Sequence, residues 1–443
     1  MSTPTSSSSS ESCAVLGGEG FLGGALVSAL LSRHPASHVA SLGLTQRRFD
    51  TPSGAPYRFF RTDITSYDSV LAALRASGAT TVFHTASPHA KASARVWREV
   101  NVGGTAALVR ACRDAGVRKL VFTSSMTVVY EQGVALKNVD ERMPRIREDE
   151  DEGEETYAGT KAKAEQLVLE ANGQDGLLTC ALRIGGIIGP GDRQVLPGFI
   201  GVYNAGQSAF QMGDNLNLFD FVTVKNVVHA HLLAAERLDA PPIPLTTLDN
   251  RLPAIACTVQ RRALPTSKHP EPIDPANPPP SDDPPFPSSR NRWNQFFRPA
   301  TGVDDSSAPD SDLTLAGQAV FITNGEPIAF WSFARAVYHA YSARPPRWYE
   351  PVALPSAVGM LFATLSEWAG WVQGRRPDEC GVNRAYMAYV LRDMYFDIER
   401  ARRLLGYEPI ESLEEGIRTG VEWYKRDEAR EKERNRAGQA KTK

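Results

Sequence analysis

Residues 13–31 read CAVLGGEGFLGGALVSALL, an apolar run followed by a glycine-rich turn and a second apolar run. The glycines at 17, 20 and 23 would allow a tight turn, close approach of a pyrophosphate to backbone amides, and close packing of a helix on a strand. A strand is expected before these glycines and a helix after them, which is the context of a dinucleotide-binding turn rather than a surface loop. The stretch therefore predicts that the chain binds a dinucleotide cofactor.

Short apolar runs continue to alternate with longer amphipathic runs as far as residue 184. We expect strands at residues 13–16, 38–44, 57–60, 81–84, 119–124 and 177–184, and helices at 21–31, 66–77, 97–115 and 157–170. Strands and helices that alternate over short links are typical of a parallel, doubly wound sheet. The predicted fold class is therefore α/β, a Rossmann fold over residues 13–238 that contributes part of the substrate cleft.

Composition divides the rest of the chain. Sixteen of the 31 prolines lie between Pro241 and Pro309, and such a stretch cannot bury enough apolar surface to offset the entropy of ordering it. We expect a disordered Pro-rich insert at 239–316, a smaller C-terminal substrate and membrane-association region at 317–426, and a charged, solvated tail at 427–443. The Ser-rich residues 1–12 are expected to be a disordered tail rather than a secretory signal.

Charge and cysteine content exclude other classes of protein. The 49 Lys and Arg nearly balance the 51 Asp and Glu, so nothing favours a nucleic-acid partner. The five cysteines are scattered without a CxxC pair, which argues against a disulfide framework and a zinc site. His84, His89, His229 and His231 are interpreted as packing or capping residues, and no metal is expected.

The residues after the second predicted strand bear on the choice of cofactor. The position 20 residues after Gly23, where an acid would hold the ribose 2′-hydroxyl of NAD, is Gly43. Arg47 and Arg48 follow closely, and guanidinium groups match the geometry of a 2′-phosphate. This argument favours NADP, with NAD as the alternative if the two arginines only form a solvated loop.

A second motif, Tyr157-Ala-Gly-Thr-Lys161, opens a predicted helix. A spacing of four places both side chains on one helix face, and an ammonium beside a phenol lowers its pKa toward neutrality. Ser125 follows a predicted strand, at the edge where such sheets bind ligands. Ser125 could donate to a substrate oxygen, Tyr157 exchange its proton, and Lys161 hold the phenolate and the nicotinamide ribose. A chance Tyr-Lys spacing is the alternative.

The glycine turn, the serine and the Tyr-x-x-x-Lys motif, in this order, resemble an extended short-chain dehydrogenase/reductase. VFTSSMTVVY, FITNGEP and RARRLLGYEPIESLEEGI resemble the 3β-hydroxysteroid dehydrogenase family, and within it are most similar to fungal sterol-4α-carboxylate 3-dehydrogenases (decarboxylating). The resemblance covers residues 13–238 and 317–425. It departs from the family pattern at Leu16, where relatives have Thr, and at Ile184, where they commonly have Pro.

The resemblance implies an enzyme that uses NAD or NADP to oxidise the 3β-hydroxyl of a sterol or triterpenoid 4α-carboxylate to the ketone, with decarboxylation, in sterol C-4 demethylation. The alternatives are another 3β-hydroxysteroid dehydrogenase, a carbonyl reductase or epimerase of the extended group, and a non-catalytic dinucleotide sensor. The implied catalytic residues are Ser125 (rather than Ser124), Tyr157 and Lys161. Besides Tyr157, Lys161, Arg47 and Arg48, the cofactor-binding residues would be Gly17, Gly20, Phe21, Leu22, Gly23, Asp63 (facing adenine), Ile64, Thr85, Ala86 and Ser87.

One more segment, residues 352–372, is apolar and ends with two tryptophans, Trp368 and Trp371. With Pro355 and Glu367 inside, a spanning helix is disfavoured, and a helix lying in the membrane surface beside the substrate entrance is expected. The alternative is a buried core helix. With the resemblance, this implies a peripheral or monotopic protein of the endoplasmic reticulum membrane whose catalytic domain faces the cytosol, near other sterol C-4 demethylation enzymes. The acidic run 148–155 is expected to be a solvated loop.

Overall fold

The computed structural model describes residues 12–33, 38–46, 56–89, 92–131, 134–146, 156–243, 313–342, 352–374 and 383–441. Several sequence expectations lie outside these residues. They are the N-terminal tail up to residue 11, Arg47 and Arg48, the whole acidic run 148–155, and the greater part of the Pro-rich insert.

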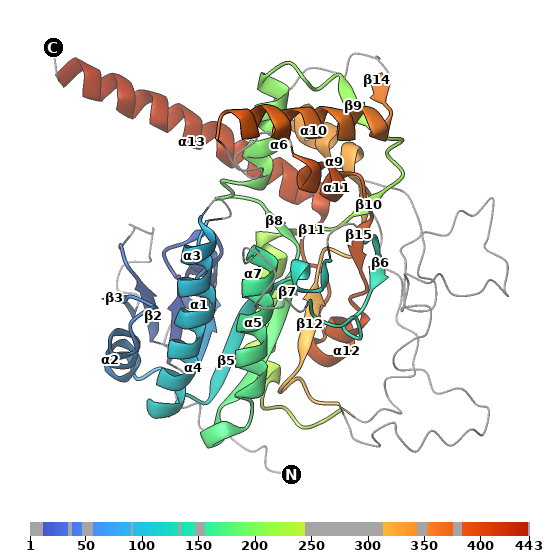
Figure 1. Ribbon diagram of the computed structural model, residues 1–443. Helices are drawn as coiled ribbons and strands as arrows, with labels where there is room; N and C mark the ends of the chain where they lie inside the picture. The colour runs from blue at the N-terminus through green and yellow to red at the C-terminus, as the bar shows by residue number, and fades with distance from the viewer. Residues whose placement is uncertain are drawn as a thin grey trace, which may run out of the picture.

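A seven-stranded sheet forms the centre of the molecule (Figure 1), with every neighbouring pair parallel. Its order is β12-β7-β5-β4-β1-β2-β3. The strands are β1 (Cys13–Leu16), β2 (Val39–Gly43), β3 (Tyr57–Arg61), β4 (Thr81–His84), β5 (Lys119–Ser125), β7 (Leu178–Ile184) and β12 (Ala319–Ile322). The order reverses between β1 and β4, and sheets of this kind bind ligands at the carboxyl ends of the strands at such a reversal. The predicted α/β fold class is confirmed.

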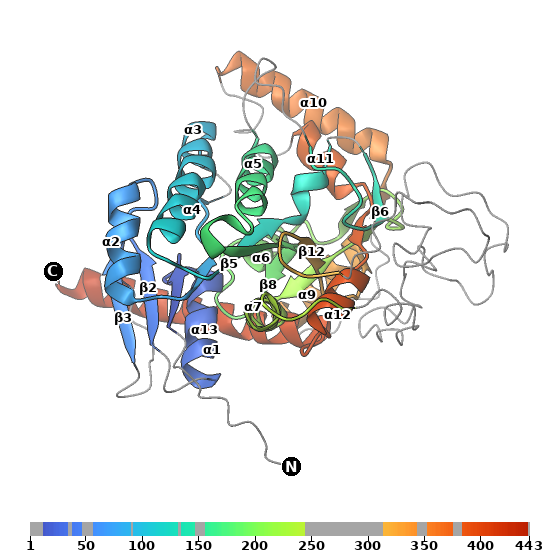
Figure 2. The same cartoon turned by 90° about the horizontal axis from the view of Figure 1, so that it is seen from below.

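Helices cover both faces of this sheet (Figure 2). On one side lie α2 (Tyr67–Ser77), α4 (Thr105–Asp114) and α5 (Tyr157–Glu170), and on the other lie α1 (Phe21–Arg33) and α7 (Val224–Arg237). Hydroxyl side chains start three of them, because Ser66, Thr156 and Thr223 each accept a hydrogen bond from a backbone amide of the first turn. The helix predicted at 97–115 begins earlier, as α3 (Ala94–Trp97), and passes through a π-helical segment, η1 (Arg98–Gly104), before α4.

The C-terminal region contributes strands to the same sheets as the preceding part of the chain. It supplies β12, which pairs with β7 and completes the main sheet. A four-stranded sheet also mixes the two parts of the chain, in the order β13 (Ile328–Ala329), β10 (Leu218–Phe219), β15 (Met394–Phe396) and β6 (Leu136–Val139). Strands from before and after the expected insert at 239–316 therefore pair within the same sheets.

The remaining elements gather at one end of the main sheet, above β5 and β7 (Figure 1). Two small sheets pair β11 (Phe221–Thr223) with β8 (Gly186–Ile188), and β14 (Val352–Leu354) with β9 (Phe210–Met212). The helices here are α6 (Val195–Asn204), α9 (Phe330–Ser342), α10 (Ser356–Val372) and α11 (Arg384–Val390), while α12 (Glu399–Leu405) packs against α7 and β12.

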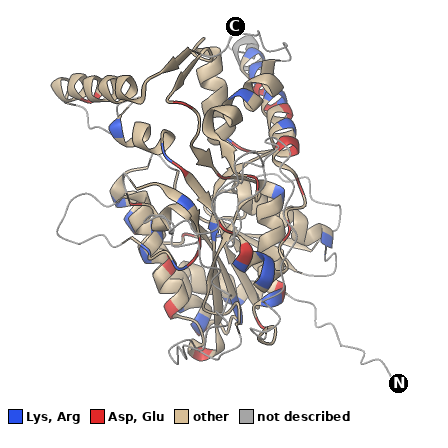
Figure 3. Ribbon diagram, turned by 90° about the vertical axis from the view of Figure 1, so that its right-hand side faces the viewer, with Lys and Arg blue, Asp and Glu red and all other residues tan. Residues whose placement is uncertain are grey.

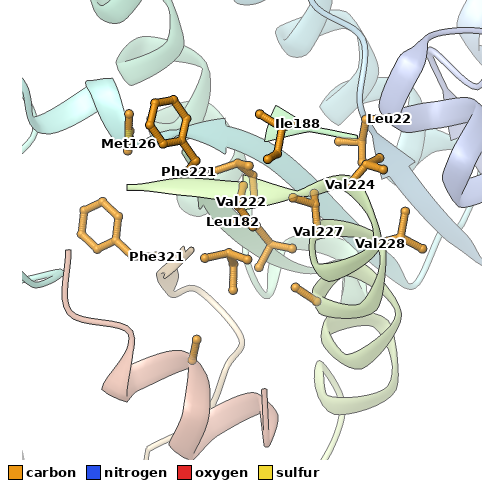
Figure 4. Close-up of a cluster of buried hydrophobic side chains, with 14 of the residues drawn as sticks. Leu22, Met126, Leu182, Ile188, Phe221, Val222, Val224, Val227, Val228 and Phe321 are labelled. Atoms are coloured by element: carbon orange, nitrogen blue, oxygen red, sulfur yellow. The ribbon is translucent and has the colours of Figure 1, made fainter. Parts of the chain in front are cut away.

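A continuous apolar cluster joins these parts (Figure 4). Met126, directly after the end of β5, lies near Phe221, whose ring stacks on Phe333 with 3.7 Å between centroids. Phe321 of β12 stacks on Phe396 of β15 at 4.5 Å. Each such ring, buried fully, stabilises the fold by about 1.5–3 kcal/mol. The end of β5 is thus held between the sheet and the C-terminal elements.

The segment expected to be a charged, solvated tail from residue 427 belongs, as far as residue 441, to the helix α13 (Leu413–Lys441). Figure 3 shows acidic and basic residues alternating along this helix toward the C-terminus. Arg418 pairs with Glu415 and Glu422, and Lys432 pairs with Glu428. Pairs spaced three or four residues apart lie on one helix face and favour the helix. The side chains of the last turns described, up to residue 436, are exposed, as the prediction of a solvated segment requires.

Candidate active site

The glycine turn links β1 to α1 at the switch point of the sheet. Gly17 has φ of +85°, and a Cβ there would lie 2.7 Å from the Ala86 backbone nitrogen. A Cβ on Gly23 would lie 2.1 Å from the Gly17 carbonyl oxygen, so the helix packs against the turn too closely for any side chain. Gly20 between them is exposed. This cradle, at a helix N-terminus, fits the pyrophosphate of a dinucleotide.

The loop after β4 forms the opposite side of the switch point. Thr85 donates to the Leu16 carbonyl oxygen through both its amide and its hydroxyl, at 2.9 Å each. Ala86 lies directly against Gly17, and the Ser87 hydroxyl donates to the Asn101 side chain at 3.3 Å. The structure therefore places this predicted cofactor loop beside the glycine turn.

Two further predicted cofactor residues follow β3. Ile64 is buried, and its side chain lies against Gly104, where a Cβ would come within 2.9 Å of it. Asp63 is exposed, and its carboxylate accepts hydrogen bonds from the Thr65 amide and hydroxyl. The carboxylate thus fixes the turn out of β3.

The structure distinguishes the two serines at the end of β5. Ser124 is buried, and its hydroxyl donates to Glu165 at 2.6 Å. Ser125 is half-buried, and its hydroxyl lies 2.8 Å from that of Thr127 and accepts from the Thr127 amide. Ser125 is therefore the serine placed to meet a ligand at the carboxyl edge of the sheet.

Tyr157 and Lys161 open α5 and lie on one face of it, as their spacing predicts. The centroids of the Tyr157 and Trp97 rings lie 6.0 Å apart, and the two rings meet nearly edge-on. Lys161 is buried, and its Nζ donates to the Thr123 carbonyl oxygen at 2.6 Å, 4.3 Å from the centre of the Phe122 ring. The lysine is thereby held near the C-terminal end of β5.

The expected lowering of the tyrosine pKa by the lysine is wrong for this structure. Burial raises the pKa of Tyr157, and a hydrogen bond with Ser87 lowers it only in part. Burial lowers the pKa of Lys161 to about 7, against the opposing effect of the nearby Glu165 charge. The physical reason is burial of the phenol, and the Lys161 Nζ is bound to the Thr123 carbonyl oxygen.

A buried ion cluster behind the lysine was not anticipated. Glu165, one turn after Lys161, is fully buried and accepts hydrogen bonds from Ser124 and from Arg183 of β7, the latter at 2.8 Å. Arg145 approaches the same carboxylate at 3.5 Å. Burial by itself would raise the pKa of Glu165, but the charge and hydrogen bonds of Arg183 and the bond from Ser124 outweigh it, so the pKa is lowered. Its signal in the sequence is the four-residue spacing from Tyr157 to Lys161 to Glu165.

Two histidines pack in the core. His84 lies with Nε2 3.0 Å from the Thr105 hydroxyl, and His231 lies with Nε2 2.8 Å from the Thr123 hydroxyl. Burial lowers the pKa of His84 to about 3 and that of His231 to about 4, so both are neutral at physiological pH. Within the described parts of the chain, no group of three or more His, Cys, Asp or Glu could hold a metal ion.

The parallel sheet, the glycine turn at its switch point and the Ser125, Tyr157 and Lys161 side chains together define an oxidoreductase of the extended short-chain dehydrogenase/reductase class. The chain belongs to the 3-beta hydroxysteroid dehydrogenase/isomerase family, whose model matches residues 14–250.

Similar proteins extend this assignment over nearly the whole chain. Sterol-4-alpha-carboxylate 3-dehydrogenase, decarboxylating, of Schizosaccharomyces pombe is 33% identical over 92% of this chain and 95% of its own length. The human protein of the same name is 29% identical over 93% of this chain and 88% of its own. Among solved structures, a Thermus thermophilus UDP-glucose 4-epimerase in complex with NAD has a TM-score of 0.55 at 21% identity, covering 94% of this chain and 99% of its own. The last similarity concerns the fold alone.

Proposed function

We propose that this protein oxidises the 3β-hydroxyl of a sterol or triterpenoid 4α-carboxylate to the 3-ketone, with loss of carbon dioxide, as a step of sterol C-4 demethylation. The observation that carries the proposal is similarity over nearly the full chain to decarboxylating sterol-4-alpha-carboxylate 3-dehydrogenases from yeasts and mammals. Ser125 at the end of β5, and Tyr157 and Lys161 at the start of α5, support the proposal.

In this reaction Tyr157 accepts the proton of the 3β-hydroxyl, and Ser125 donates a hydrogen bond to the same oxygen. A dinucleotide held at the glycine turn would supply the acceptor for the hydride that carbon 3 loses. The product is a β-keto acid, in which the bond from carbon 4 to the carboxyl group breaks and its electron pair moves onto the carbon 3 carbonyl. Lys161, whose Nζ donates to the Thr123 carbonyl oxygen, would orient the nicotinamide ribose and the phenol.

We propose NAD or NADP as the cofactor. The glycine turn, the loop at Thr85–Ser87 and the residues after β3 support a dinucleotide in the switch-point crevice. The NADP preference expected from Arg47 and Arg48 concerns residues outside those described.

The purified full-length protein, incubated with a 4α-carboxysterol, should release carbon dioxide and reduced cofactor in equal amounts. A 3β-hydroxysterol without the 4-carboxyl group is the matched control and should release no carbon dioxide. Cofactor reduction without carbon dioxide release from the carboxysterol would replace the proposal with a plain hydroxysteroid dehydrogenase. If neither substrate reacts with either cofactor, the proposed function is rejected in favour of a non-sterol substrate or a dinucleotide sensor.

We also propose that α10 lies in a membrane surface, as a peripheral or monotopic contact at the endoplasmic reticulum with the catalytic domain on the cytosolic side. The alternative of a buried core helix is wrong, since Leu361, Phe362, Leu365, Trp368, Trp371 and Val372 are each 52–73% exposed. The residues that α10 buries are the small Gly359, Ala363 and Gly370. Its acid, Glu367, is paired with Arg384. No helix among the described residues is long and apolar enough to cross a membrane.

Helix α10 has large apolar side chains on its outer face and small ones on its inner face. This arrangement supports an interfacial helix, because the apolar side chains of the outer face are stabilised only when they leave water. Such a surface would also bring the enzyme to its insoluble substrate, and we propose that other sterol C-4 demethylation enzymes share the same membrane.

Replacing Leu361, Leu365 and Trp368 together by Ser should weaken binding to phospholipid vesicles by at least about tenfold, since each side chain contributes on the order of 1 kcal/mol. Co-sedimentation with vesicles measures this. Ile410, which is 63% exposed outside α10, is the matched control, and Ile410→Ser should bind as the unaltered protein does. Equal vesicle binding by the triple variant would reject the membrane role of α10.

A further inference from the structure

The end of β2 lacks the carboxylate that would hold an adenosine ribose, because Gly43 stands there. The space beside Gly43 is filled by a side chain of the glycine turn. A Cβ built on Gly43 would lie 3.7 Å from Cγ of Glu19, the third residue of the glycine turn at residues 17–23. The Glu19 side chain therefore lies alongside the position where an acid on β2 would begin.

The Glu19 carboxylate is fixed in this place. Its Oε1 accepts hydrogen bonds from the Ser41 hydroxyl of β2 at 2.6 Å and from the Tyr57 hydroxyl of β3 at 2.7 Å. The residue is only 7% exposed. Burial raises the pKa of Tyr57, and the bond to Glu19 raises it further, so the phenol remains a neutral donor to the carboxylate. Two strands thus hold the carboxylate beside the turn that fits the pyrophosphate.

We propose that Glu19 supplies the ribose-binding carboxylate that β2 lacks, and that it makes the enzyme select NAD over NADP. A carboxylate accepts a hydrogen bond from a ribose 2′-hydroxyl, whereas it repels a 2′-phosphate in a partly desolvated site. The inference deepens the proposed function by naming the cofactor, and it rests only on the dinucleotide site. It opposes the expectation from Arg47 and Arg48, which predicts the reverse preference.

Binding of NADH and NADPH to the full-length protein without sterol, followed by nicotinamide fluorescence, tests this directly. We expect the dissociation constant for NADPH to exceed that for NADH by at least about tenfold. Glu19→Gln keeps an oxygen acceptor for Ser41 and Tyr57 but removes the charge, so it should tighten NADPH binding by about tenfold and weaken NADH binding severalfold. Glu170→Gln removes an exposed charge from α5 and should leave both constants unchanged.

Tighter binding of NADPH than of NADH by the unaltered protein would overturn the proposal, and so would a Glu19→Gln variant with an unchanged ratio of constants. If Glu19→Gln does not fold, Glu19→Asp is the second variant. It retains the charge and should still bind NADH more tightly than NADPH. Cofactor binding is measured without turnover. If the protein selects NADH but does not oxidise carboxysterols, that result would reject the proposed function and would leave the role of Glu19 unchanged.

Discussion

Tyr157→Phe should lower kcat by at least about a thousandfold and leave the dissociation constant for reduced cofactor within about threefold, because general-base catalysis typically contributes factors of this size. The substitution removes only the hydroxyl that accepts the substrate proton. The aromatic ring remains, with its edge-on contact to Trp97 at 6.0 Å. Steady-state turnover and cofactor fluorescence, measured on the same preparation, separate the two effects.

The pH profile gives this experiment a control. Because burial raises the pKa of Tyr157, the deprotonated base becomes more abundant as pH rises, and kcat of the unaltered enzyme should increase into the alkaline range. The residual rate of Tyr157→Phe should lack that rise. Wild-type turnover in the variant would reject Tyr157 as the base.

Glu165→Ala should lower the free energy of unfolding by about 3–5 kcal/mol, the usual cost of leaving a buried charge unpaired. Arg183 is 4% exposed and would lose its carboxylate partner, while Ser124 would lose its acceptor. Urea denaturation measures the change. Glu170→Gln on the exposed side of the same helix is the matched control and should change stability by less than about 0.5 kcal/mol.

The ion pair of Glu165 and Arg183 also predicts how stability depends on pH. The pKa of Glu165 is lowered in the folded protein from its usual 4.5, so its contribution is fully present above that value and is lost as pH falls through the folded pKa. The stability difference between the unaltered protein and Glu165→Ala should therefore shrink below about pH 4.5. A difference that stays constant down to pH 3, or a fully stable variant, would show that the ion cluster does not hold the site together.

Local pattern predicted much of the fold and part of the site. The turn at residues 17–23 lies between a strand and a helix, and α5 begins at Tyr157 and ends at Glu170, as its periodicity indicated. The preference for Ser125 over Ser124 agrees with the position of the half-buried hydroxyl. These features depend on residues near one another in the sequence, where periodicity and turn chemistry are informative.

Features that depend on distant partners were not predictable in this way. Glu19 meets Ser41 and Tyr57 on two later strands, and Glu165 meets Arg183 on another strand. The pKa of Tyr157 depends on burial and on a hydrogen bond with Ser87, and neither follows from a spacing of four. The place of β12 in the sheet likewise follows from pairing with β7 rather than from any local signal.

The pairing of β7 with β12 also constrains how the chain is made. A ribosome releases β7 long before it releases β12, and during that interval β7 is an edge strand whose outer backbone groups have no partner. Exposed edges of this kind attract other nascent chains. A truncated product that stops before Ala319 would keep that edge open permanently and would leave Arg183 without the Phe321 ring it covers. Such fragments should aggregate, and slow elongation between the two strands would lengthen the time for which a chaperone has to protect the unfinished sheet.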